Sequence, residues 1–143
     1  MSNEMMRKEM QEAIEAGERA LRCLYSAGDK LSSAKNWGLL DLFGGGFITD
    51  LIKHSKMEDA SRYMEEAKYE LQRFQRELKD VSGTIDLRID VGSFLSFADF
   101  FFDGLLADFM VHSKIADAKR QVEETARRVE HILAELKNQY RSW

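Results

Sequence analysis

The sequence predicts an all-α protein: an elongated antiparallel three-helix bundle with coiled-coil-like packing, a short apolar helical cap and one extended, β-like segment. Two observations favour this fold class. The chain has 143 residues and no proline, so nothing in its composition prevents very long helices. Three stretches carry small or apolar residues at alternating spacings of three and four, which is typical of helices that bury one stripe against a partner. Because this length is typical of one domain, we treat residues 1–143 as a single helical domain.

The first stripe predicts a long helix from Met6 to Ala34. Its many alanines would let a partner helix approach closely. Gly28 and Asp29 are the weak point, where the helix could bend or restart. Three consecutive glycines at 44–46 should end this helical region and reverse the chain, because glycine tolerates positive φ. The stripe consists of Met6, Met10, Ala13, Gly17, Ala20, Leu24, Ala27, Leu31 and Ala34.

Two further stripes predict a second and a third long helix. The second should start near Thr49, or at Ser55, where Ser55 to Glu58 fits a capping box, and it should end at Ser82–Gly83. The third should run from Gly104 to the C-terminus. Its stripe contains two consecutive spacings of four residues, which locally relax the supercoil. The second stripe consists of Ala60, Met64, Ala67, Leu71, Phe74, Leu78 and Val81, and the third of Val111, Ile115, Ala118, Val122, Ala126, Val129, Leu133, Leu136, Tyr140 and Trp143.

An extended segment should join the second and third helices. Residues 85–91 alternate apolar and charged side chains, which is the period of a half-buried β-strand. The chain offers no second alternating segment. We therefore expect either an extended linker packed on the helices or a strand that pairs with the same strand of a second copy. The candidate dimer contacts are Ile85, Leu87, Ile89 and Val91.

The next residues, Ser93 to Phe102, are strongly apolar. We expect a short buried helix here, packed against the first chain reversal as a cap. An apolar ligand pocket is the alternative, but aromatic residues at this density more often form core. The expected cap comprises Trp37, Leu39, Phe43, Phe94, Phe97, Phe100 and Phe101.

One stretch occurs twice, at 41–60 and at 99–118, and both copies contain the pattern G-x3-D-x3-H-S-K-x2-D-A. The copies lie 58 residues apart, as the shift from Gly46 to Gly104 shows. In each copy an aspartate precedes a histidine by four residues, so the two would share one face of a helix. Two such pairs brought together could bind zinc or iron. The candidate ligands are Asp50, His54, Asp108 and His112.

We favour a structural interpretation of this repeat. An aspartate near a helix start interacts well with the free backbone N–H groups there, and Lys56 and Lys114 would repel a cation. Both copies would then mark the start of a long helix at the same end of the bundle. A metal site remains the alternative.

Charge and composition exclude several classes of function. The 21 basic and 25 acidic residues give a net charge of −4, which argues against a nucleic-acid binder and against adsorption to an anionic membrane. The most apolar stretch, 94–111, contains three aspartates. Each would cost roughly 2.5–3.5 kcal/mol at a bilayer centre, so we expect no membrane span. Cys23 has no partner for an internal disulfide, and the first ten residues lack a signal-peptide pattern. We expect a cytoplasmic protein.

No group of residues predicts catalysis. The chain has no C-x-x-C pair and no Ser/His/Asp order, and the glycines at 44–46 lack the spacing of a phosphate-binding loop. We expect a non-enzymatic protein without a cofactor, which acts as a helical interaction or scaffold protein and forms a homodimer. The alternative is a metal-binding helical bundle that uses the two Asp–His pairs.

Overall fold

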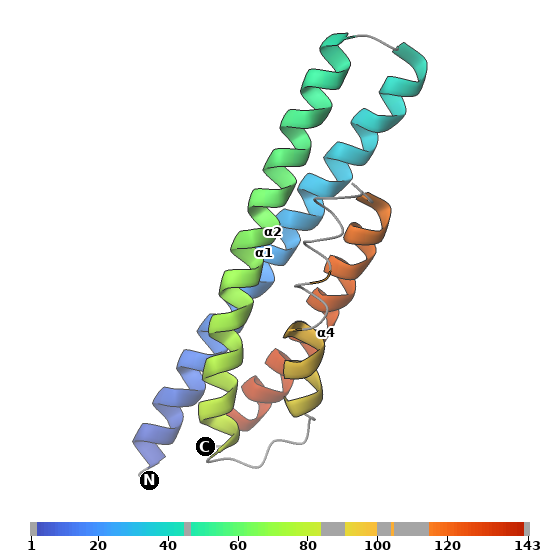
Figure 1. Ribbon diagram of the computed structural model, residues 1–143. Helices are drawn as coiled ribbons and strands as arrows, with labels where there is room; N and C mark the ends of the chain where they lie inside the picture. Colours follow the sequence, from blue (N-terminus) through green and yellow to red (C-terminus); the bar gives the residue numbers. More distant parts are fainter. Residues whose placement is uncertain (1–2, 45–46, 84–90, 100–103, 105–114, 142–143) are drawn as a thin grey trace.

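The computed structural model shows an almost entirely helical protein, which confirms the all-α prediction (Figure 1). It describes residues 3–44, 47–83, 91–99, 104 and 115–141, with side chains for 4–32, 59–83, 91–99, 104 and 117–141. Three long helices are α1 (Asn3–Gly44), α2 (Phe47–Ser82) and α4 (Ile115–Arg141). A shorter helical segment covers residues 91–99. No helix within these ranges is both long and apolar enough to cross a membrane.

α1 and α2 form a long antiparallel hairpin (Figure 1). α1 has 42 residues, which corresponds to ~63 Å. It runs through Gly28 and Asp29 without the restart that we considered there. α1 ends at Gly44 and α2 begins at Phe47, so the chain reverses at the glycine triplet as predicted. α2 starts close to Thr49, the earlier of the two expected positions, and the capping-box residues from Ser55 lie inside the helix.

The C-terminal end of α2 falls where the sequence predicts it. The helix ends at Ser82, and the backbone N–H of Gly83 donates a hydrogen bond of 3.1 Å to the carbonyl of Lys79. The hydroxyl of Ser82 donates to the same carbonyl at 3.2 Å. The two donors satisfy a carbonyl that has no partner further along the helix.

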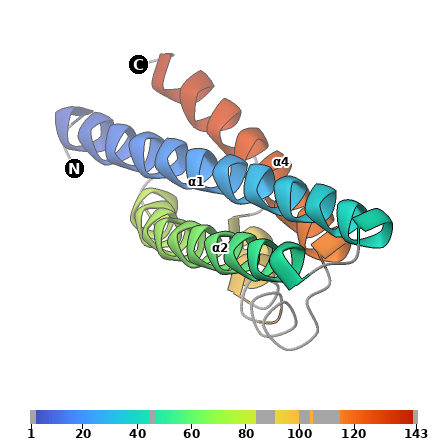
Figure 2. The same cartoon turned by 90° about the horizontal axis from the view of Figure 1, so that it is seen from above.

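α4 packs against α1 in the antiparallel direction. The guanidinium of Arg7, near the start of α1, lies 5.1 Å from the ring centroid of Tyr140, near the end of α4. Lys137 Nζ lies 3.0 Å from Glu18 Oε1. α1 contacts both α2 and α4, and Figure 2 shows α2 alongside α1 and α4 crossing it at an angle. α1 is therefore the shared support of the described fold.

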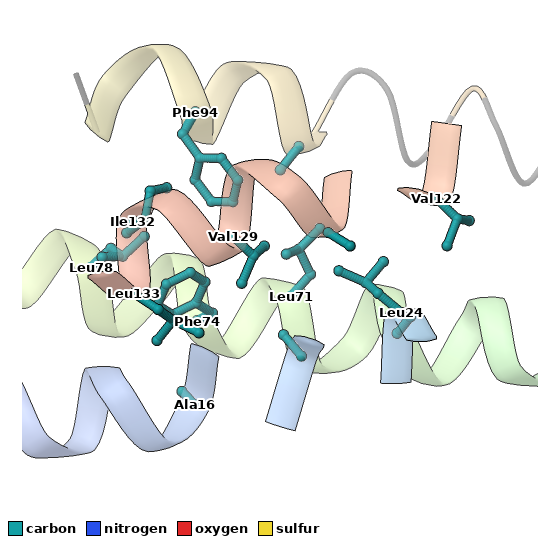
Figure 3. Packing of buried hydrophobic residues seen from close by; sticks show 14 of the residues in the cluster. Ala16, Leu24, Leu71, Phe74, Leu78, Phe94, Val122, Val129, Ile132 and Leu133 are labelled. Atoms are coloured by element: carbon teal, nitrogen blue, oxygen red, sulfur yellow. The ribbon is translucent and has the colours of Figure 1, made fainter. Parts of the chain in front are cut away.

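The core confirms the buried stripes that the sequence predicts. In α1, residues from Met10 to Leu31 along the stripe are buried, and every member of the α2 stripe is buried as well. The stripes are nevertheless narrower than the buried faces. Ala16, Thr125 and Ile132 are buried beside them, because α1 faces two helices and α4 also meets segment 91–99. Figure 3 shows this packing, with Phe94 directed toward the α2 residue Phe74. The buried members of the third stripe are Ala118, Val122, Ala126, Val129, Leu133 and Leu136.

Segment 91–99 docks on the side of the molecule rather than at the chain reversal. Phe94 is buried and meets Phe74 of α2 edge to face, with ring centroids 6.1 Å apart. Phe74 in turn lies against Gly17 of α1, which is ~39 Å along the helix from Phe43 at the reversal. Our prediction of a cap that joins Phe94 to Phe43 was therefore wrong. Periodicity shows that a segment is apolar, but it does not show which face of a bundle receives it.

The predicted extended segment falls mostly outside the described residues. Ile85, Leu87 and Ile89 lie there, so their pairing with a second copy stays a prediction. Val91 belongs to the helical segment 91–99 and is buried in the chain's own core. Val91 is therefore not part of an extended segment, and we withdraw this residue as a dimer contact.

Candidate functional site

The two Asp–His pairs are only partly covered by the structure. Asp50 and His54 lie four residues apart in the first turns of α2, so both occupy one side of the helix. Asp108 and His112 lie outside the described residues. Among the side chains that the structure describes, no three His, Cys, Asp or Glu residues gather closely enough to hold a metal ion. The convergence of the two pairs on a metal remains a hypothesis.

The helices that follow the two repeat copies meet α1 at nearly equivalent positions. Phe74 of α2 and Leu133 of α4 both approach Gly17. The step from 74 to 133 is 59 residues, one more than the repeat offset of 58. Ala60 and Ala118, which end the two copies, are both fully buried. Because residues 105–114 lie outside the described part of the chain, the matching of the two helix starts stays a prediction.

A groove runs between α1 and α4. Its volume is 280 Å³ and its floor is formed by Leu24, Gly28, Val122 and Ala126. The buried members of this floor are apolar, and Gly28 is the smallest of the four. A groove with an apolar floor between two helices suits the side chains of a further helix. The rim is polar and consists of Tyr25, Asp29, Ser32, Lys119, Glu123, Arg127 and Glu130.

Four charged residues form a row along α4, and three of them, Glu123, Arg127 and Glu130, line this groove. Arg120, Glu123, Arg127 and Glu130 are all exposed, and their charges alternate in sign at spacings of three, four and three residues. Lys119 Nζ lies 3.8 Å from Glu123 Oε1, and Arg120 Nη2 lies 3.3 Å from Asp117 Oδ1. We call these four residues the charged stripe. The chain contains the charged stripe as the pattern R-x2-E-x3-R-x2-E. We did not predict the stripe from the sequence, because we considered periodicity only at the positions expected to be buried.

A second groove, between α1 and α2, contains the lone cysteine. Its volume is 330 Å³ and its lining includes Cys23 and the exposed Tyr69. Burial raises the pKa of the Cys23 thiol, and Glu70 and Glu66 raise it further. The thiol is therefore protonated at neutral pH and is a poor nucleophile. This groove does not provide the activated group that covalent catalysis needs.

An acidic group lies between the N-terminal part of α1 and the C-terminal part of α2. Burial raises the pKa of Glu77, and the neighbouring charges of Glu12, Asp80 and Glu9 add to this shift, while Arg73 opposes it. Nearby like charges disfavour the ionised form of the Glu77 carboxylate. We therefore expect this group to lower the stability of the fold at neutral pH.

Comparison of the chain with protein-family models, with curated proteins and with solved structures found no match.

Proposed function

We propose that the protein is a non-enzymatic helical interaction or scaffold protein that works as a homodimer. The observation that carries the proposal is the groove between α1 and α4, which runs between two long helices and has an apolar floor and a polar rim. Such a groove receives the side chains of another helix. Among the polar residues around it, Lys119 and Glu123 form an ion pair along α4, which suits a contact surface better than a reaction centre.

We further propose that the long helices form an elongated three-helix bundle with coiled-coil-like packing. The support for this proposal is the three-and-four spacing of the buried residues in all three helices. A long, stiff hairpin of this kind presents its outer faces over several tens of ångströms, which is the property that a scaffold needs.

The oligomeric state tests the proposal directly. The chain has a mass of 16.5 kDa, and light scattering on purified protein at micromolar concentration should give twice that value. Dilution to nanomolar concentration provides the control, because a specific dimer dissociates by mass action. A mass of one chain at every concentration up to about 100 μM would contradict the homodimer.

A metal-binding bundle is the second candidate, and the repeated Asp-x3-His spacing favours it. Asp50 and His54 would supply a carboxylate and an imidazole from one face of α2. Elemental analysis of protein purified without chelator, together with melting curves in zinc, iron or manganese, tests it. Bound metal that is lost in His54→Ala supports this function. Purified protein that contains no metal, and whose melting temperature is unchanged by all three ions, excludes the metal-binding function.

A further inference from the structure

We propose that the homodimer forms by antiparallel pairing of α4 with α4 of a second copy, laid over the groove between α1 and α4. The inference rests on the proposed homodimer and names its contact surface. The partner is a second copy of this chain, and the recognition is electrostatic along the charged stripe with close helix approach at Gly28.

The charged stripe is complementary to itself in the antiparallel direction. A two-fold axis that passes between Glu123 and Arg127 places Glu123 opposite the second copy's Arg127, and Arg120 opposite its Glu130. Each pair occurs twice by symmetry, because a two-fold contact uses the same surface on both copies. Parallel pairing would instead place each charged residue opposite the same residue of the second copy, and this like-charge contact is destabilising. The alternation therefore selects both the partner and its direction.

Two members of the stripe are available for such pairing. In the part of the chain that the structure describes, Arg127 and Glu130 make no ion pair with another side chain. Both are exposed. Arg120 and Glu123 have local partners, but these contacts join exposed or partly exposed side chains three or four residues apart, and such pairs are weak. Exchange of a local partner for one on a second copy costs little.

Gly28 is the second, independent observation. A Cβ at Gly17 would lie 2.6 Å from Leu133 Cδ2, so the chain's own packing requires a glycine there. A Cβ at Gly28 would meet only Val122 Cγ1, at 3.9 Å, which is ordinary contact. Nothing in the described part of the chain requires Gly28, although glycine inside a helix costs about 1 kcal/mol relative to alanine. Close approach of a second helix at this groove supplies the reason.

The size of the surface suits a stable dimer. With the axis between Glu123 and Arg127, the two α4 helices overlap over residues 115–135, which is ~30 Å, and two adjacent helices are ~20 Å wide. Their combined face is therefore ~600 Å², which is about the area that each partner buries at the lower end of standard interfaces. Tyr25 on the rim is half exposed, and exposed tyrosines are typical of contact surfaces.

Charge reversal tests the surface. Sedimentation equilibrium should give the dimer dissociation constant of the wild type, of Glu123→Arg, of Arg127→Glu and of the double variant Glu123→Arg/Arg127→Glu. Each single reversal creates two like-charge contacts across the axis and should weaken the dimer roughly tenfold or more. The double variant restores opposite charges and should recover most of the wild-type affinity. Circular dichroism and melting curves control for folding, since both positions are exposed.

Groove filling provides a second test that leaves the charges unchanged. Gly28→Met should weaken the dimer, whereas Gly28→Ala should affect it less, because its side chain is much shorter. If the wild type is a dimer and the single reversals and Gly28→Met leave its dissociation constant unchanged, this surface is overturned and the homodimer still stands. A double variant no better than the single variants would also overturn it. A monomeric wild type would overturn both the surface and the homodimer.

Discussion

Phe74 and Phe94 meet edge to face, with their ring centroids 6.1 Å apart and their planes at 65°. This contact joins α2 to the helical segment 91–99, and Gln75 Nε2 reinforces it by donating a hydrogen bond of 3.1 Å to the carbonyl of Leu95. Three residues further along the segment, the ring centroid of Phe97 lies 3.9 Å from the guanidinium of Arg128 in α4. The segment therefore links α2 and α4 on one side of the molecule, while α1 links them on another.

Gly17→Ala should destabilise the fold. The added Cβ would lie 2.6 Å from Leu133 Cδ2 and 2.8 Å from Phe74 Cε1, so two core side chains must move. Overpacking of this kind costs about 1–3 kcal/mol, against a gain of about 1 kcal/mol from helix propensity. Urea unfolding followed by circular dichroism measures the difference.

Gly28→Ala is the matched control for this prediction. Its Cβ has room, so the gain in helix propensity should appear as about 1 kcal/mol of added stability. Measurements at a concentration where both variants are monomeric separate folding from association. Equal stabilisation by the two variants would show that α1 is not clamped between α2 and α4 at Gly17.

Phe94→Ala should remove most of the energy that holds segment 91–99 in place. Phe94 is 4% exposed, and truncation of a buried phenylalanine costs about 3–5 kcal/mol. Ser96→Ala, at an exposed position of the same segment, should change the free energy of unfolding by less than about 0.5 kcal/mol. Thermal unfolding compares the two. A Phe94→Ala protein as stable as Ser96→Ala would mean that the segment does not dock against Phe74.

Glu77→Gln should stabilise the protein at neutral pH but not in acid. Burial and nearby carboxylates raise the pKa of Glu77 above its ordinary value of 4.5. The folded state thus binds this proton more tightly than the unfolded state, and stability falls as pH rises from about 4.5 through the raised pKa. The glutamine side chain does not ionise, so it avoids that loss. Because Glu77 is partly exposed, the gain at pH 7 should be below about 1 kcal/mol.

Urea unfolding at pH 7 and at pH 3.5 measures this effect. The advantage of Glu77→Gln should shrink toward zero at the lower pH, where the wild-type carboxyl is protonated in both states. Glu65→Gln, at an exposed site on the same helix, serves as the control for removal of a charge. A gain that is the same at both pH values would show that ionisation of Glu77 is not its cause.

The helices of this protein follow from local signals in the chain. Residues such as Leu24, Leu71 and Val129 repeat at spacings of three and four, and a helix that buries one stripe places them all in the core. The glycine triplet ends α1 at Gly44 because glycine has no side chain to favour a helix. Both signals act within a few residues, so sequence alone is enough to predict them.

The arrangement of the helices depends on contacts that the local pattern does not contain. Phe94 is apolar in any setting, and its place beside Phe74 depends on how segment 91–99 packs against α2 and α4. Thr125 is buried although it is polar, and its hydroxyl donates to the carbonyl of Gln121 at 2.8 Å. The charged stripe is visible in the sequence, but its exposure and its position beside the groove of Gly28 are known only from the fold.

The most direct test of the proposed homodimer is the distance between spin labels on α4. Labels would be attached at Ala134→Cys or at Asn138→Cys, two exposed positions, with Cys23→Ala removing the native thiol. An antiparallel dimer with its axis between Glu123 and Arg127 predicts separations along the helices of ~27 Å and ~39 Å respectively, so the distance grows toward the C-terminus. Dipolar coupling that is absent, or equal at the two positions, would contradict it.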